Sequence, residues 1–175
     1  MNLNKQVSGI ALAVITVWTM TVLSVSGQSI QAEHSSASSN AQERTIQGAW
    51  RTKVTLRNCQ TDLPVVAPFL RGLFTFNKGG TMSEFGVGPG SSPALRSPGH
   101  GVWQREQGWK DYSFAFTYYR YDASGVFIGS QKVTATLELG ASGDEFTTKS
   151  VIEVFDANDN KIGTFCATAA GTRFE

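Results

Sequence analysis

The stretch TIQGAWRTKVTLR, residues 45–57, alternates apolar and polar side chains. Its even-numbered positions, such as Ile46, Trp50 and Val54, are mostly apolar, whereas most odd-numbered positions are polar. A period of two residues is typical of a β-strand with one buried face and fits a helix badly. The stretch therefore predicts a half-buried strand.

The same period recurs along the rest of the chain, with Gly, Asn, Asp and Pro between the runs as turn residues. Most of the links are short enough for hairpins, which make neighbouring strands antiparallel. Only the links 58–68 and 87–100 are long. We predict eight strands, over residues 45–57, 69–76, 80–86, 101–107, 111–121, 126–139, 144–155 and 161–173.

Eight antiparallel strands in sequential order can close into a barrel, which removes both exposed edges of the sheet. The predicted fold class is therefore all-β, a closed eight-stranded antiparallel up-and-down β-barrel. A two-sheet sandwich is the main alternative, although it usually needs crossing connections. In the barrel, both long links would leave at the same end and would flank one mouth.

The N-terminal part of the chain predicts export. In residues 1–32, Lys5 precedes an uncharged run rich in Val, Ile, Leu and Ala, as in a secretory signal peptide, with cleavage after Gly27 or Ala32. An uncleaved membrane anchor is the alternative, since about 20 apolar residues can span a bilayer. Residues 33–44 are Ser-rich and predict a flexible linker. The folded domain is then 45–175, periplasmic or extracellular.

The charge balance argues against a nucleic-acid partner. The chain has 15 basic and 14 acidic residues, and loss of residues 1–32 removes one Lys, which leaves a net charge of zero. Lys and Arg are scattered singly, whereas proteins that bind nucleic acid usually show a basic patch. No stable membrane insertion is expected after signal cleavage. The oligomeric state is left open.

Cys59 and Cys166 are the two cysteines, and both lie in the part that we expect to be exported. An even number of cysteines in an oxidising compartment favours a disulfide, with two free thiols as the alternative.

Gly48, Ala49 and Trp50 form a G-x-W motif on the first predicted strand, and Arg173 lies near the end of the last. This combination resembles the lipocalins and the wider calycin superfamily. The resemblance implies a lipocalin-like barrel in which Trp50 closes one end and Arg173 packs across its ring. Allene oxide cyclase-like and avidin-like barrels are structural relatives that fit as well.

The numbering of the two cysteines agrees with this closure. Paired residues of antiparallel strands have numbers that add to a nearly constant sum, which is 223 for Trp50 and Arg173 and 225 for Cys59 and Cys166. A shift of two residues keeps both side chains on one face and within reach of each other. The disulfide and the contact between Trp50 and Arg173 therefore describe the same pairing of the first and last strands.

Residues 111–121 provide the richest candidate lining for the barrel interior, because aromatic side chains share one face of this strand. Such a face could bind a small ligand, with tyrosine hydroxyls to orient it, or could simply fill the core. The candidate lining residues are Tyr112, Phe114, Phe116 and Tyr118, together with Phe74, Phe76, Met82, Glu84 and Gln131 from neighbouring strands.

Two of these candidates are polar and leave alternatives open. An inward Glu84 would need a partner or a ligand, and the alternative is that it points outward. Gln131 could orient a ligand or form a hydrogen bond to a neighbouring Thr or Tyr. In the link 87–100, Arg96 and His100 would border the mouth, where His100 could act as a general base. No catalytic residue, cofactor or metal site is assigned, because no motif for one is present.

These features favour an exported protein that holds a small apolar molecule inside the barrel. A solid interaction module is the first alternative, with Leu63, Val65, Val66 and Phe69 as an apolar contact surface. A barrel cyclase or isomerase that uses Glu84 or His100 is the second. A non-enzymatic role is favoured, and the question of catalysis stays open.

Overall fold

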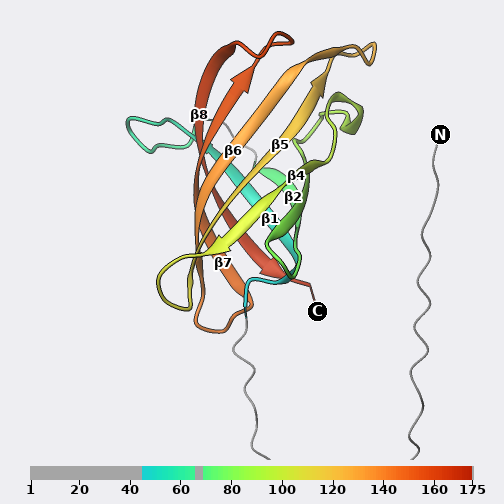
Figure 1. Ribbon diagram of the computed structural model, residues 1–175. Helices are drawn as coiled ribbons and strands as arrows, with labels where there is room; N and C mark the ends of the chain where they lie inside the picture. Colours follow the sequence, from blue (N-terminus) through green and yellow to red (C-terminus); the bar gives the residue numbers. More distant parts are fainter. Residues whose placement is uncertain (1–44, 66–68, 175) are drawn as a thin grey trace, which may run out of the picture. The chain divides into compact units, whose positions relative to one another are not determined.

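The structure is a computed structural model that describes residues 45–65 and 69–174. The signal peptide and the linker that the sequence predicts lie outside the described residues. Eight strands form a closed antiparallel barrel in sequential order (Figure 1), so the predicted fold class is confirmed. The strands are β1 (Gly48–Arg57), β2 (Leu70–Phe76), β3 (Thr81–Val87), β4 (Gly99–Arg105), β5 (Asp111–Tyr121), β6 (Phe127–Leu139), β7 (Glu145–Phe155) and β8 (Lys161–Arg173).

The strand bounds agree with the prediction to within one residue, except at the start of β1 and at both ends of β4, which begins and ends two residues earlier than predicted. β1 begins at Gly48 and not at Thr45, because Gly48 has a φ of +123° and the chain turns there. β4 begins at Gly99, two residues earlier than predicted, because its ladder with β3 continues to the pair Glu84 and Gly99. Pairing with β3 at Gly99, and with both β3 and β5 from His100 onward, outweighs the weak strand preference of Gly.

Helix contributes little to the part of the chain that the structure describes, where a single 3₁₀ turn, Pro93–Leu95, interrupts the link between β3 and β4. Within residues 45–65 and 69–174, no helix is both long enough and apolar enough to cross a membrane.

The seam between β1 and β8 has the predicted register. Trp50 pairs with Arg173 and Arg57 with Cys166, so both pairs add to 223. Cys59 follows the end of β1 and forms a disulfide with Cys166, with their Cα atoms 5.1 Å apart. The predicted disulfide is therefore confirmed.

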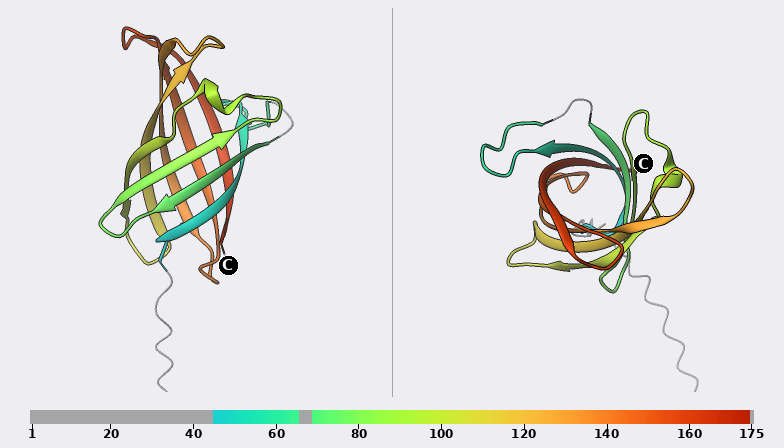
Figure 2. Two further views of the ribbon diagram at one scale, coloured as in Figure 1. Left: turned by 90° about the vertical axis from the view of Figure 1, so that its right-hand side faces the viewer. Right: turned by 90° about the horizontal axis from the view of Figure 1, so that it is seen from above.

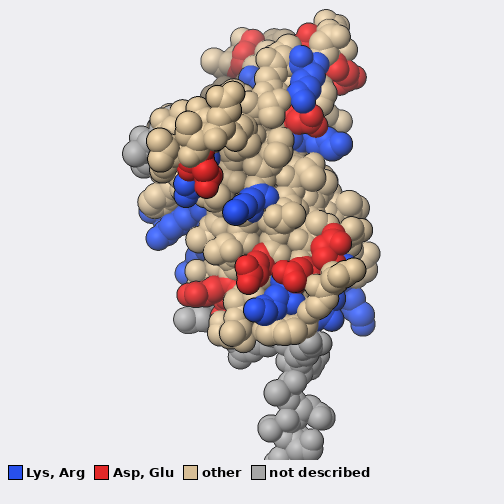
Figure 3. All heavy atoms as spheres, turned by 90° about the vertical axis from the view of Figure 1, so that its left-hand side faces the viewer, with Lys and Arg blue, Asp and Glu red and all other residues tan. Residues whose placement is uncertain are grey.

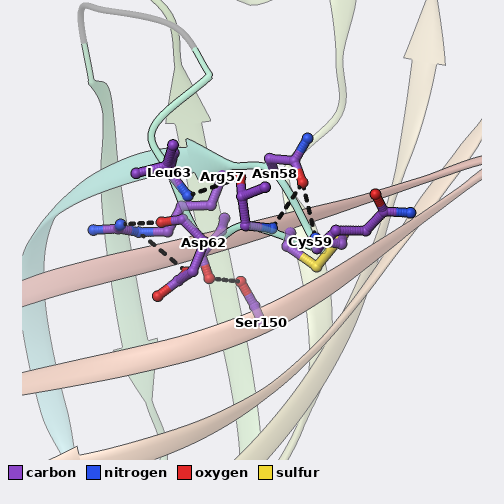
Figure 4. Close-up of a disulfide and its surroundings, with 10 residues drawn as sticks. Arg57, Asn58, Cys59, Asp62, Leu63 and Ser150 are labelled. Atoms are coloured by element: carbon purple, nitrogen blue, oxygen red, sulfur yellow. Dashed lines mark hydrogen bonds and ion pairs between the residues drawn. A yellow bond between two sulfur atoms is a disulfide. The ribbon is translucent and has the colours of Figure 1, made fainter.

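The disulfide ties down the start of the β1–β2 loop, which is also held by its own polar contacts (Figure 4). Asn58 Oδ1 accepts hydrogen bonds from the backbone N–H groups of Gln60 and Thr61, at 2.8 and 3.0 Å. The Arg57 guanidinium donates to the backbone carbonyl of Asp62 at 2.7 Å. These contacts fold the first half of the loop into a compact turn over β8.

Trp50 and Arg173 close one end of the barrel. The Trp50 side chain is completely buried, and its indole N–H donates to the carbonyl of Ile46 at 2.8 Å. The Arg173 guanidinium carbon lies 4.2 Å from the centre of the Trp50 ring. The guanidinium also donates to the carbonyls of Thr45, Gln47 and Gly143 at 2.6 to 2.7 Å. One side chain of β8 thus binds both the segment that enters β1 and the β6–β7 turn at the closed end.

Aromatic side chains fill the interior next to Trp50. The Trp50 and Phe146 rings lie 4.8 Å apart between centroids, and Phe76 contacts both Phe114 and Phe146 at about 6 Å. Tilted and edge-to-face rings of this kind leave little space, so this half of the barrel is a solid core. Its other buried members include Ile46, Met82, Tyr112, Leu137 and Leu139.

The opposite end of the barrel is the mouth, where the loops β1–β2, β3–β4, β5–β6 and β7–β8 emerge (Figures 1 and 2). The hairpins β5–β6 and β7–β8, orange and red, extend beyond the other strands at this end (Figure 2, left). On the face of the barrel drawn in Figure 3, acidic and basic side chains are interspersed.

We expect removal of the disulfide, by Cys59→Ser together with Cys166→Ser, to lower the free energy of unfolding by about 3 to 4 kcal/mol. The bond closes a loop of 107 residues, which restricts the unfolded chain. Urea denaturation of oxidised wild type, reduced wild type and the double variant provides the measurement. A loss below about 1 kcal/mol would contradict the prediction.

We expect Arg173→Met to lower the free energy of unfolding by about 3 kcal/mol, because it removes charged hydrogen bonds to backbone carbonyls and the cation over Trp50. The matched control is Arg51→Met, since the Arg51 guanidinium also lies over a ring, that of Phe174 at 4.8 Å, but on the exposed side of β1. The control should lose less than about 1 kcal/mol. Equal losses in the two variants would disprove a special role for Arg173.

Candidate functional site

A cavity of about 280 Å³ lies inside the barrel, between the aromatic core and the β3–β4 loop. Phe74, Phe114 and Phe116 belong both to the core and to the cavity wall, so they form its floor. The wall is mainly apolar and includes Val54, Leu70, Val133, Ile152, Ala167 and Ala169. Polar residues interrupt it, namely Arg71, Glu84, Ser91, Ser92, Arg96, Tyr118, Arg120, Gln131, Thr148 and Ser150.

Small inward side chains explain why this half of the barrel is hollow. Gly72 on β2 and Ala167 and Ala169 on β8 occupy inward positions that carry large side chains elsewhere in the barrel. Nearer the closed end, β1 and β7, the strands on either side of β8, carry the large side chains of Trp50 and Phe146. The interior therefore changes from filled to hollow along the barrel axis.

A buried ion pair lies in the cavity wall. Glu84 on β3 points inward and is 6% exposed. Arg96, from the β3–β4 loop, binds the Glu84 carboxylate with both terminal nitrogens, and its Nη1 lies 3.2 Å from Oε1. Nη1 also donates to the Gly86 carbonyl at 3.0 Å. The partner that an inward Glu84 requires is therefore Arg96.

The short ladder between β3 and β4 creates the space that Arg96 enters. The pairing ends at Glu84, so the last residues of β3 have no β4 neighbour. The loop pairs instead with β5, where the Ser97 N–H donates to the Tyr119 carbonyl and the Tyr119 N–H donates to Ser97 Oγ, both at 2.9 Å. Arg96 therefore lies in the gap and supplies the hydrogen bond to Gly86 that a strand would otherwise provide.

Two glycines make room for the carboxylate. A Cβ atom at Gly99 would lie 2.7 Å from Glu84 Oε2, and one at Gly86 would lie 2.9 Å from Oε1. Both distances are shorter than a real Cβ contact, so a larger residue at either position would displace the Glu84 carboxylate. Glycine at both positions therefore keeps the ion pair in place.

Burial controls the ionisation of this site. Removal from water raises the pKa of Glu84, and the nearby charge and hydrogen bonds of Arg96 oppose this rise. Burial also raises the pKa of Tyr118, whose ring lies 3.6 Å from the Arg96 guanidinium carbon. The neutral Tyr118 hydroxyl donates a hydrogen bond to the side-chain oxygen of Gln131.

Six of the nine predicted lining residues surround the cavity, and three do not. Phe74, Glu84, Phe114, Phe116, Tyr118 and Gln131 line the cavity. Phe76, Met82 and Tyr112 face inward but are buried in the solid core. The alternation of side chains identifies the inward face of a strand, but it does not reveal at which height along the barrel the packing ends.

The two predicted mouth residues have different positions. Arg96 reaches into the cavity wall through its contact with Glu84. His100 was expected in the loop, but it lies within β4 and is exposed on the outside of the barrel, where it pairs with Ser83 and Thr117. The expectation for His100 was wrong because β4 starts at Gly99, which takes the inward position and leaves His100 facing outward.

The sequence reasoning missed the wall formed by β7 and β8. Thr148, Ser150 and Ile152 share the inward face of β7, and Ala167 and Ala169 share that of β8. A usable signal was present, because small residues at 167, 169 and 171 recur with a period of two, in contrast to the aromatic run on β5. Small residues on one wall and large residues on the other indicate an asymmetric interior.

Comparisons with known proteins leave the site to be interpreted from its geometry. The chain matches no protein-family model and no curated protein. Within the described ranges 45–65 and 69–174, no three His, Cys, Asp or Glu side chains come together in a way that could hold a metal ion. The arrangement of an apolar cavity with few fixed polar groups is compatible with the binding of a small molecule.

We expect the wild-type protein to gain stability relative to Glu84→Gln as the pH falls from 7 to about 4.5. The raised pKa means that folded Glu84 takes up a proton at a higher pH than unfolded Glu84, which favours the folded state on acidification. Urea denaturation of both proteins at pH 7, 5.5 and 4.5 measures the difference in unfolding free energy. If the stability of the wild type relative to Glu84→Gln stays constant or falls on acidification, the pKa of Glu84 is not raised.

Proposed function

We propose that this protein is an exported, lipocalin-like carrier or sensor that holds a small, mainly apolar molecule in the cavity of the barrel. The observation that supports the proposal is the preformed cavity of about 280 Å³, with an apolar wall and a few fixed polar groups. Ligand cavities typically measure roughly 300–1,000 Å³. The ligand is accordingly small.

The packing around the cavity argues for a binding site rather than a flaw in the core. Protein interiors are close-packed and contain few voids larger than a water molecule. Here the other half of the same barrel is solid, and the hollow half has both small wall residues and a buried ion pair. Burying the charges of Glu84 and Arg96 costs free energy. A role in orienting a ligand explains why the barrel contains this ion pair.

The disulfide supports the proposed location. Disulfides persist in oxidising compartments, such as the bacterial periplasm and the extracellular space. The confirmed bond between Cys59 and Cys166 agrees with export through the predicted signal peptide. The barrel order and the contact between Trp50 and Arg173 support the proposed relationship to the calycins.

An interaction module is the second candidate, because part of the expected apolar surface is exposed. Leu63 and Val65 on the β1–β2 loop are 64% and 59% exposed. Phe69 is half-buried, with Lys53 and Arg71 each 5.3 Å from its ring centre, and Val66 lies outside the described residues. The patch is compatible with docking of a carrier to a partner, so the two candidates do not exclude each other.

The catalytic alternative has less support from the geometry. Glu84 is held by Arg96, and His100 lies on the outer face of the adjacent strand. The two side chains therefore do not meet as an acid and a base.

The proposal predicts that Ala167→Phe weakens ligand binding by filling the cavity. Octan-1-ol serves as a small apolar probe, and isothermal titration calorimetry measures its binding. We expect at least about a tenfold loss of affinity in this variant. Ala170→Phe is the matched control, because Ala170 lies on the same strand but on the exposed outer face. Absence of octan-1-ol binding in the wild type, or unchanged binding in Ala167→Phe, would contradict the proposal.

A further inference from the structure

Arg120 carries a positive charge at the mouth of the cavity. It lies two residues beyond Tyr118 on the inward face of β5, is half-buried and lines the cavity. Its guanidinium has no ion pair or hydrogen bond within the described residues 45–65 and 69–174. An arginine that lines a cavity without a protein partner is available to pair with a negative group of a ligand.

The charges that line the cavity do not cancel. Glu84 is the acidic residue in the lining, and Arg96 already neutralises it through a two-nitrogen contact. Arg71 points to the outside of β2, where its guanidinium lies over the Phe69 ring. The uncompensated charge that faces the cavity is therefore that of Arg120.

Gln131 supplies a second donor beside Arg120. The Tyr118 hydroxyl occupies the side-chain oxygen of Gln131, which leaves the Gln131 amide N–H groups available toward the cavity. Tyr118 pairs with Gln131 and Arg120 pairs with Gly129, so Arg120 and Gln131 are diagonal neighbours on adjacent strands. Diagonal neighbours lie about 7–8 Å apart between their Cα atoms, a spacing that long side chains bridge.

The wall beneath these two donors is apolar. Phe116, Val133, Ile152 and Ala167 line the cavity between the mouth and the aromatic floor. The cavity therefore offers positive charge and N–H donors at its open end and hydrocarbon surface below. A molecule that matches this arrangement has a negative group at one end and a short apolar body.

We infer that the ligand is a small amphipathic monocarboxylate whose carboxylate is bound by Arg120 and the Gln131 amide, with its apolar body against Phe116 and Val133. This inference rests on the proposed carrier function and names its ligand class. A guanidinium binds a carboxylate through two parallel hydrogen bonds, a geometry that gives both strength and orientation. An uncharged ligand would bury Arg120 without compensating its charge.

The test compares three eight-carbon probes that differ only in the head group: octanoate, octan-1-ol and octylammonium. Calorimetric titrations at pH 7.5 should show octanoate binding at least about tenfold more tightly than octan-1-ol, a difference of about 1.4 kcal/mol. Octylammonium should bind more weakly than octan-1-ol. This comparison uses the wild-type protein alone, so it does not depend on the folding of any variant.

Arg120→Gln should remove the preference for octanoate and leave the affinity for octan-1-ol within about twofold. Retained octan-1-ol binding shows that the variant is folded. Lys149→Gln is the control for the loss of one positive charge, because Lys149 is exposed on the outer face of β7, and it should keep the full preference. Loss of octan-1-ol binding in a variant whose circular dichroism spectrum matches the wild type would refute the assignment of Arg120 to the head group alone.

The outcomes separate the two proposals. Equal binding of octanoate and octan-1-ol by the wild type, or an unchanged preference in Arg120→Gln, would overturn the carboxylate assignment and leave the carrier function standing. Absence of binding for all three probes would overturn both.

Discussion

The seam between β1 and β8 is the constraint on which the rest of the barrel depends. Without it, the eight strands form an open sheet with two edges that expose unpaired backbone groups. The seam is secured at one end by Arg173, which covers the Trp50 ring and binds carbonyls of the incoming chain, and at the other end by the disulfide between Cys59 and Cys166. Two different interactions thus fix the same strand pair.

Side-chain size divides the closed barrel into two parts with different roles. Large aromatic residues around Trp50, together with aliphatic side chains, fill one half. Small residues on β8 leave the other half hollow, and there the polar groups gather. The stable half supports the hollow half, so a cavity can exist without the collapse that a uniformly under-packed core would undergo.

The gap between β3 and β5 gives the hollow half its chemistry. Since β4 pairs with β3 only as far as Glu84, the loop before β4 returns to pair with β5 and delivers Arg96 into the wall. The short ladder between β3 and β4 thus leaves room for the buried ion pair of Glu84 and Arg96 beside the cavity. Barrel rims often carry such irregularities because a regular ladder would leave no space for functional side chains.

The sequence alone determined the eight strands, their order and the seam. The period of two residues and the turn residues are local signals. The seam follows because the residue numbers of paired antiparallel residues, such as Trp50 and Arg173, add to a nearly constant sum. The sequence also identified the aromatic floor and Gln131. Only the tertiary structure decided that Phe76, Met82 and Tyr112 belong to the solid core, that His100 faces outward and that Arg96 neutralises Glu84. These features depend on where packing ends along the axis and on how a loop fills a gap, and both follow from contacts between segments far apart in the chain.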